Sequence, residues 1–314
     1  MAELPDAGPT KGAPTTPATD VYPRKILEYM EGFLISKTVF TSCELGVFDV
    51  LLAAERPLSA EEISQAVGAS LDGTQRLLAA CAGLQLLNTH WDNGQVFYSN
   101  TEQSRVFLTR SSPLSLCQSI QYSSRTIYLC WHYLTDAVRE GRNQYEKAFG
   151  VSSKDLFQAL YRSDEEMVKF MHLMNSIWNI CGRDVVTAFD LTPFKVICDL
   201  GGDFFKDSLP VADLYILARI LHDWTDERCI ELLCRIYKAC KPGGAVLLVE
   251  ALLNEDGSGP LTAQLYSLNM LVQTEGRERT GAQYAALLAA SGFTNIQHRL
   301  TGKIYDAVLG HKET

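Results

Sequence analysis

The sequence predicts an α/β protein with a helical, winged-helix-like domain followed by a Rossmann-like domain whose truncated sheet is mainly parallel and doubly wound. From residue 196 onward, short apolar runs alternate with amphipathic stretches, as in a parallel sheet with crossover helices. Before residue 110, two short helical patterns precede a hairpin pattern, which is the order of a winged helix. The expected divisions are a disordered tail at 1–20, the winged-helix-like domain at 21–110, a helical connecting region at 111–190 and the Rossmann-like domain at 191–314.

Composition narrows the classes of partner. The net charge of −9 disfavours nucleic acid and anionic membranes. Nine cysteines are scattered without a CxxC pair or a signal peptide, which indicates reduced thiols in the cytoplasm, without a disulfide framework or a metal site. No apolar run is long enough to span a bilayer.

The N-terminal segment is expected to form two helices after the tail, which is rich in Pro, Thr and Ala. Apolar residues recur at near-helical spacing from Ile26 to Leu51. This much apolar surface must be covered, either by packing within the chain or by a second copy in a dimer. The sequence leaves both open.

The winged-helix-like pattern begins at a capping box, Ser59–Glu62, which opens a short helix that ends at Gly68. A second helix starts near Leu71, and Asn93-Gly94 marks the turn of a hairpin. This order raises DNA binding as an alternative. The charges argue against DNA binding, because positions 59–100 contain Arg76 and His90 as their only basic residues but four acidic residues.

The second half is expected to build the sheet. Predicted strands are Val196–Leu200, Leu214–Ile220, Ala245–Ala251, Ile296–Leu300 and Ile304–Leu309, and predicted helices lie at Asp226–Cys240, near Leu261–Thr274 and at Gly281–Ser291. Lys241–Gly244 is expected to end the first of these helices.

The junction after residue 202 is unusual. An apolar strand that ends in an acidic residue and a glycine turn is how a nucleotide-type cofactor site opens in such a sheet. A helix and a second strand with an acid for the ribose should follow. Here the chain runs directly from Val196–Gly202 into Asp203–Asp207, so a piece of that site is absent.

Four stretches in order, together, are similar to a known enzyme family. They are Val196–Gly202, Asp203–Phe205, Ala218–Trp224 and Gly276–Thr280, supported by Tyr266–Gly276 and Asp136–Tyr145. They resemble the class I, S-adenosylmethionine-dependent small-molecule O-methyltransferases, from about residue 22 to the end. The resemblance implies a methyltransferase domain, a dimerisation domain that forms a homodimer, and S-adenosylmethionine as cofactor. It also implies that the substrate is N-acetylserotonin or a similar hydroxyindole, whose methylation gives melatonin.

The resemblance assigns acid–base roles to His222 and to an acidic residue beside it. His222 follows a predicted strand and matches the general base, which takes the hydroxyl proton during attack on the sulfonium methyl. A base is needed because a phenol-like pKa of about 10 against about 6.5 for imidazole makes full prior ionisation cost roughly 5 kcal/mol. Glu278 is the first candidate to orient the imidazole, with Asp223 and Glu250 as others. The alternative for Glu278, between two arginines, is a surface charge.

Binding roles follow in the same way. Substrate contacts are expected from Asn269 and Gln273, four residues apart on one helix face, and from Asp223. Cofactor contacts are expected from Tyr161 and Trp178 at the methionine end, Asp199 and Gly201 at the glycine turn, and Asp203, Phe204 and Arg219 near the adenosine. No metal ligand is expected.

The resemblance also measures the gap at roughly forty-five residues, the size of a βαβ unit. Val196–Gly202 must then either keep its own place in the sheet and become an edge strand, or replace the lost strand that precedes Asp203. Loss of the ribose acid alone removes about 1.5–3 kcal/mol of cofactor binding, so we expect weak binding. Three functions stay open: an impaired hydroxyindole methyltransferase, a non-catalytic dimerisation partner of the full-length enzyme, and a methyltransferase of another phenol.

Overall fold

The structure is a computed structural model that describes residues 22–151 and 163–314. The predicted tail and Tyr161 lie outside these residues. The helices are α1 (Arg24–Leu45), α2 (Val47–Ala54), α3 (Ala60–Val67), α4 (Leu71–Gly83), α5 (Glu102–Phe107), α6 (Cys117–Tyr122), α7 (Tyr128–Trp131), α8 (Leu134–Glu140), α9 (Tyr145–Phe149), α11 (Asp164–Val186), α12 (Asp226–Ala239), α13 (Leu261–Gln273) and α14 (Gly281–Ala290). The strands are β1 (Leu58–Ser59), β2 (Leu87–Asp92), β3 (Gln95–Asn100), β4 (Ile197–Asp199), β5 (Ala212–Ala218), β6 (Cys240–Glu250), β7 (Thr294–Arg299) and β8 (Asp306–His311).

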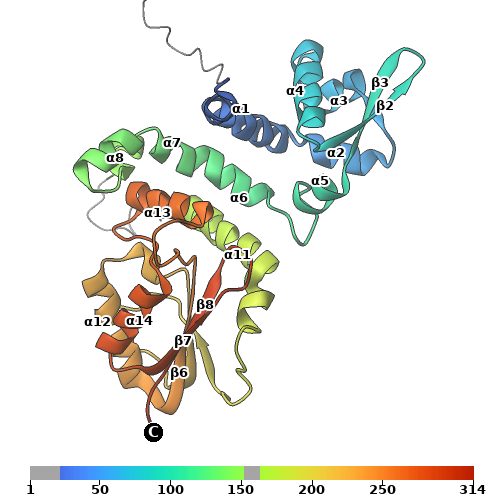
Figure 1. Ribbon diagram of the computed structural model, residues 1–314. Coiled ribbons are helices and arrows are strands. Elements are labelled where there is room, and N and C mark those ends of the chain that lie inside the picture. The colour runs from blue at the N-terminus through green and yellow to red at the C-terminus, as the bar shows by residue number, and fades with distance from the viewer. Residues whose placement is uncertain (1–21, 152–162) are drawn as a thin grey trace, which may run out of the picture.

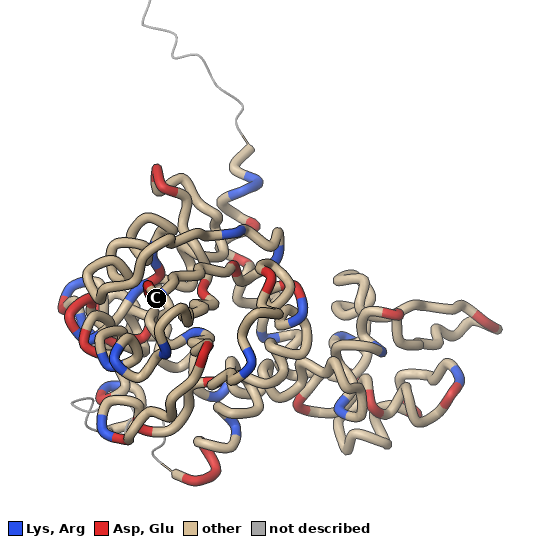
Figure 2. Tube along the Cα trace, turned by 90° about the horizontal axis from the view of Figure 1, so that it is seen from below, with Lys and Arg blue, Asp and Glu red and all other residues tan. Residues whose placement is uncertain are grey.

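The winged-helix-like order predicted for the N-terminal part is confirmed. Ser59 and Glu62 form both bonds of a capping box at the start of α3. Asn93 and Gly94 both have positive φ, 46° and 82°, which suits the tight turn between β2 and β3. These elements enclose a separate core in which Phe48 is completely buried. Figure 2 shows how sparse basic residues are on α3, α4 and this hairpin, and the one arginine there, Arg76, pairs with Asp72.

Helix α1 exposes a large apolar face. Tyr29, Met30 and Phe33 are 66%, 65% and 54% exposed, and Ile26, Leu34 and Ile35 are exposed as well. Only the last turns of the helix, at Ser42 and Cys43, are buried against the rest of the chain. Packing within the described part of the chain therefore leaves most of this apolar surface uncovered.

The second sheet has the strand order β4-β5-β6-β8-β7. β5 is parallel to β4 and β6, whereas β8 is antiparallel to both β6 and β7, so four of the five strands run in one direction. Helices cover both faces, with α12 and α14 on one and α11 on the other (Figure 1). Successive residues of β6 serve the two cores alternately: Val246 and Leu248 lie in one, Ala245, Leu247 and Val249 in the other, all completely buried. The expectation of a doubly wound, mainly parallel sheet is confirmed.

The junction segment keeps its own place in the sheet. Ile197, Cys198 and Asp199 form β4 and pair in parallel with Leu214, Tyr215 and Ile216 of β5. In a doubly wound sheet, the first strand neighbours the fourth, whereas the third lies further out. β4 is therefore the opening strand of the cofactor site, and it now forms the edge of the sheet. Val196 and Ile197 are consequently 45% and 50% exposed.

The connection from β4 to β5 contains no helix. It runs through residues 200–211, all of which the structure describes, and its middle is a turn at Asp203–Asp207. Within this turn, the backbone N–H of Asp203 donates to Oδ2 of Asp207 at 3.0 Å, and Lys206 pairs with Asp203 at 2.9 Å. These two contacts hold the turn together from within.

One predicted boundary is wrong. Lys241–Gly244 was expected to separate helix from strand, but β6 begins at Cys240 and includes these residues. Ala212 pairs with Cys240 and Leu214 pairs with Ala245, so the four residues form a bulge. The N–H of Gly243 donates to the carbonyl of Lys312, and its φ of 73° suits glycine. A tertiary hydrogen bond therefore draws this turn-like sequence into the strand.

Candidate active site

His222 lies at the carboxyl end of β5, in a single 3₁₀ turn formed by Leu221–Asp223. This is the edge at which parallel sheets of this kind bind their ligands. The backbone N–H of Leu221 donates to Oε1 of Glu250 at 2.9 Å, which ties the turn to the end of β6. The side chain of His222 is 10% exposed, so it is held in the protein with a small opening to solvent.

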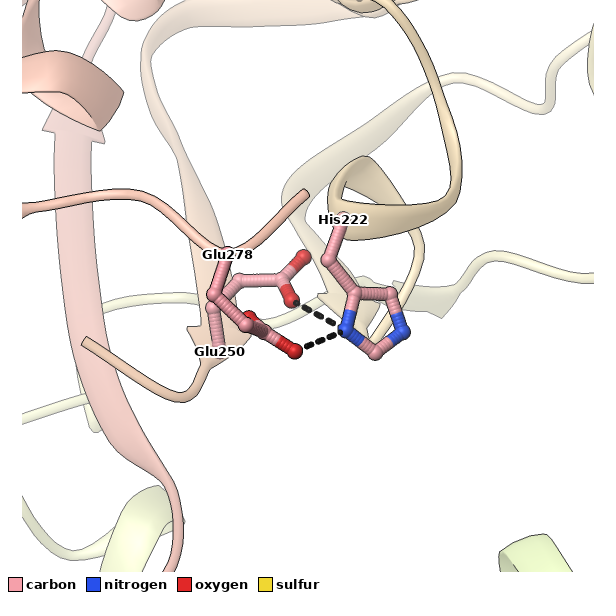
Figure 3. Close-up of side chains that lie close together, drawn as sticks. All are labelled: His222, Glu250 and Glu278. Atoms are coloured by element: carbon pink, nitrogen blue, oxygen red, sulfur yellow. Dashed lines mark hydrogen bonds and ion pairs between the residues drawn. The ribbon is translucent and has the colours of Figure 1, made fainter. Parts of the chain in front are cut away.

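Three carboxylates surround this imidazole. Oε1 of Glu278 lies 2.7 Å from Nδ1, and Oε2 of Glu250 lies 3.7 Å from the same nitrogen. Figure 3 shows these two side chains converging on one side of the ring. Oδ1 of Asp223 lies 3.6 Å from Nε2, on the other side. Neutral His222 that donates its Nδ1 proton to Glu278 has Nε2 left as the proton-accepting atom.

The carboxylates on Nδ1 are deeply buried. Glu250 is completely buried and Glu278 is 1% exposed, so Glu278 is not a surface charge despite its two arginine neighbours. Oε2 of each has no hydrogen-bond partner among the described residues. A buried carboxylate in this state needs a nearby positive charge or a proton. The imidazole is placed to supply one.

The site binds protons strongly. Burial opposes the charged imidazole, but Glu278, Asp223 and Glu250 outweigh it and raise the pKa of His222 to about 10. Burial also raises the pKa of Asp223 to about 6 and that of Glu250 to about 7. The proton affinity of the imidazole thereby approaches that of a phenol, whose pKa is about 10. Proton transfer from a phenol to neutral His222 is then nearly balanced.

A cation site was not expected here, yet the geometry offers one set of ligand atoms. His222, Glu250 and Glu278 place one ligand atom each within 4.8 Å of one another. The 2.7 Å contact between Nδ1 and Glu278 has the length of a charge-assisted hydrogen bond. The arrangement therefore favours a shared proton between these groups.

The two predicted substrate amides lie side by side on α13. Oδ1 of Asn269 accepts from Nε2 of Gln273 at 2.5 Å and from the indole N–H of Trp131 at 2.8 Å. Oε1 of Gln273 accepts from the hydroxyl of Tyr145 at 3.4 Å. The aromatic partners, Trp131 and Tyr145, were not among the predicted site residues. They fix the orientation of both amides.

The predicted cofactor contacts are only partly brought together. Arg219, at the end of β5, has φ of 58° and donates to the carbonyl of Met174 on α11. Its Nε is buried without a hydrogen-bond partner among the described residues, so this N–H could donate to a ligand. Trp178, on the same helix α11, packs so closely on Gly182 that a Cβ there would lie 2.6 Å from the indole ring.

The contacts around the glycine turn do not converge. Asp199 and Gly201 are exposed at the edge of the sheet, and Asp203 is paired within its own turn. Phe204 is 4% exposed and packs edge-on against Trp224, with ring centroids 6.5 Å apart. Hydrophobic burial therefore directs Phe204 into the core, and its role as a cofactor contact stays a prediction.

Two further residues shape the site and were not predicted. Arg279 is 1% exposed and bonded to both ends of the turn that carries His222. Gly276 lies against that turn so closely that a Cβ would meet the carbonyl oxygen of His222 at 2.2 Å. The sequence offered two signals: the stretch Gly276–Thr280 carries part of the family resemblance, and the alternating charge at Arg277–Arg279 also suits a solvated loop.

Comparison with known families agrees with both halves of the chain. A model of the O-methyltransferase domain matches residues 131–203 and 200–294, and a model of the O-methyltransferase dimerisation domain matches 27–110. The acetylserotonin O-methyltransferase of Gallus gallus is 55% identical over 338 positions, which cover 93% of this chain and 98% of the relative. The Homo sapiens enzyme of that name is 46% identical over 92% of this chain and 97% of its own length.

This chain belongs to the acetylserotonin O-methyltransferase family. The crystal structure of human N-acetylserotonin methyltransferase in complex with S-adenosylmethionine superposes with a TM-score of 0.92 at 45% identity, and the match covers 95% of this chain and 100% of that chain. The cofactor of the family is S-adenosylmethionine.

The comparisons also locate the gap. Of the 338 positions aligned with the chicken enzyme, this chain supplies about 292, which is 93% of 314, so about 46 positions are gaps in this chain. The two matches to the methyltransferase domain meet and overlap at residues 200–203, directly after β4. At this junction a turn that is bonded within itself follows the glycines, at the position where a doubly wound sheet has the N-terminus of a helix.

Proposed function

We propose that this chain retains the activity named for its relatives, O-methylation of acetylserotonin, at a rate reduced by its incomplete cofactor site. The observation that supports the reaction is the contact of 2.7 Å between His222 and Glu278 at the ligand-binding edge of the sheet. The substrate hydroxyl would approach Nε2 of His222, beside Asp223. Asn269 and Gln273 would bind the polar groups of the acetylated side chain.

His222 and Glu278 have separate roles in this proposal. His222 accepts the hydroxyl proton at Nε2, and Glu278 holds the ring by Nδ1 and stabilises the imidazolium that results. Because the carboxylates raise the pKa of His222 to about 10, the transfer costs little, but the free imidazole is mostly protonated at neutral pH. Activity should therefore rise with pH through the neutral and mildly alkaline range.

The expected reduction in rate follows from the structure of the junction after β4. The self-bonded turn at Asp203–Asp207 replaces the helix that would face the cofactor, and Phe204 is held in the core. A lost charge-assisted contact to the ribose alone weakens binding by about 1.5–3 kcal/mol, and the missing helix adds to this.

The test is calorimetric titration of the folded chain with S-adenosylmethionine, followed by a radiolabelled methyl-transfer assay on N-acetylserotonin. We expect weak binding and slow transfer that His222→Ala abolishes. Transfer at the rate of a full-length relative would contradict the impairment, and transfer by the His222→Ala variant would contradict the assigned base. A panel of other phenols, assayed in parallel, tests the choice of substrate.

A second function, a non-catalytic dimerisation partner, is favoured by α1. The dimerisation-domain match at 27–110 includes the exposed apolar face at Tyr29, Met30 and Phe33. A homodimer, or a mixed dimer with a full-length subunit, would cover this face. Co-expression with a full-length relative tests the proposal: mixed dimers with reduced activity support it, and unchanged activity of the relative overturns it.

The state of the cysteines supports a cytoplasmic location. All nine cysteines are free, and seven of them are buried, which suits a reducing cytoplasm. Among the residues that the structure describes, no helix is both long and apolar enough to cross a membrane.

A further inference from the structure

We propose that Arg279 is a positioning residue for His222, acting through the backbone of the turn that carries it. The catalytic importance of this role rests on the proposed function, whereas the contacts themselves do not. Arg279 lies one residue after Glu278. A single segment therefore both orients the imidazole of His222 and binds the backbone of the turn that carries it.

Four of the five N–H groups of the Arg279 guanidinium donate to partners on that turn or just beyond it, and the fifth donates to the carbonyl of Arg277 at 3.2 Å. Nη1 donates to the carbonyl of Leu221 at 2.9 Å, and Nη2 donates to the carbonyl of Trp224 at 2.7 Å. Nε and Nη2 also donate to Oδ1 of Asp226 at 2.9 and 2.7 Å. The two carbonyls flank His222 and Asp223 in the chain, so one rigid planar group sets the distance between the ends of the turn.

Burial makes these contacts specific. Arg279 is 1% exposed, and its charge is compensated mainly by Asp226 at the start of α12. A buried guanidinium must find acceptors for its N–H groups, and the carbonyls of Leu221 and Trp224 provide two of them. The Leu221 carbonyl also accepts from the backbone N–H of Trp224. Lysine keeps the charge but cannot reach three acceptors in one plane.

Gly276, three residues before Arg279 on the same segment, packs directly against this turn. A Cβ at Gly276 would lie 2.2 Å from the carbonyl oxygen of His222 and 2.5 Å from the backbone nitrogen of Trp224. Next to it, the N–H of Glu275 donates to the carbonyl of Asp223 at 3.2 Å. The backbone contacts of Glu275 and Gly276 and the guanidinium of Arg279 therefore hold the turn next to the segment that carries Glu278.

The expected consequence of loosening this grip is a change in proton binding at His222. The imidazole is faced by Glu278 and Glu250 at Nδ1 and by Asp223 at Nε2, while Arg219 acts on Asp223 from the preceding strand end. Movement of the turn lengthens the contact with Glu278. Because a lysine keeps the positive charge of position 279, any fall in proton affinity then reports position and not charge.

The test is NMR titration of the His222 imidazole in the full chain, comparing Arg279→Lys with Arg277→Lys. Arg277 is a matched control, since it also pairs with Asp226, at 3.1 Å, but its side chain is 55% exposed and leaves the turn untouched. We expect Arg279→Lys to weaken proton binding at His222 at least tenfold, and Arg277→Lys to leave it unchanged. Circular dichroism checks that each variant is folded.

A folded Arg279→Lys variant with an unchanged His222 titration would overturn the proposal. If that variant fails to fold, Asp226→Asn serves instead: it keeps both backbone contacts but weakens the hold on the guanidinium, so a smaller change in the same direction is expected and no change overturns the proposal. The titration needs neither cofactor nor turnover. It can therefore succeed even if the chain proves inactive, which separates this inference from the proposed function.

Discussion

Glu278 and His222 lie fifty-six residues apart in the chain and 2.7 Å apart in the structure. One belongs to the segment between α13 and α14, and the other to the turn after β5. Both residues are buried. Their contact joins a segment that precedes β6 in the chain to one that follows it.

Removing the charge of Glu278 should lower the pKa of His222. Glu278→Gln keeps the shape of the side chain but deletes the largest of the three interactions that favour the imidazolium, so proton binding should weaken about tenfold or more. NMR titration of the imidazole measures this. The matched control is Glu275→Gln, at an exposed glutamate of the same segment, which should leave the titration unchanged.

Stability should fall as the pH rises, and Glu250 should account for part of this fall. Its folded-state pKa of about 7 lies above the ordinary 4.5, so the folded protein holds an extra proton between these values and loses stability as pH rises through them. His222 extends the loss from pH 6.5 towards 10. Glu250→Gln should flatten the first part of the curve, by on the order of 3 kcal/mol at neutral pH. Urea unfolding from pH 4.5 to 8 measures this, and an equally steep variant would count against it.

The exposed edge strand should promote aggregation. β4 presents an unpaired strand edge with Ile197 half exposed, and such edges associate with one another unless a charge blocks them. Ile197→Lys should raise the concentration at which light scattering begins. Leu300→Lys, which adds the same charge at a 72% exposed residue outside any strand, is the control. Equal effects of both variants would show that net charge alone is responsible.

A charge on the apolar face of α1 should weaken dimerisation. Met30→Glu and Phe33→Glu place carboxylates on a face that a dimer would bury, while the fold of each chain is left intact because both side chains are more than half exposed. Analytical ultracentrifugation should show a shift towards monomer. Trp91→Glu, at a residue of the hairpin that is 67% exposed, should not alter the association. A dimer unaffected by both helix variants would place the interface elsewhere.

Local elements were predictable because short-range chemistry decides them. The capping box at Ser59 and Glu62 and the turn at Asn93-Gly94 satisfy backbone groups within a few residues, so the sequence alone indicates where α3 starts and the hairpin turns. The alternation of apolar runs and helices likewise predicts a doubly wound sheet. His222 was found in the same way, since the carboxyl end of a parallel strand is where such sheets bind ligands.

The tertiary structure decided what distant segments do to one another. The sequence could not choose between the two places open to Val196–Gly202, because both satisfy its apolar pattern; the pairing of β4 with β5 chooses the first. The sequence could not show whether Glu278 is buried or a surface charge, and it could not give Arg279 a role. A run of alternating charges has the same sequence pattern whether it lies in solvent or in a core. Burial and hydrogen-bond partners across the fold settle such cases, and they depend on residues more than fifty positions away. The sequence by itself therefore determined the elements and the family, and packing alone determined which charges meet and which strand is left at the edge.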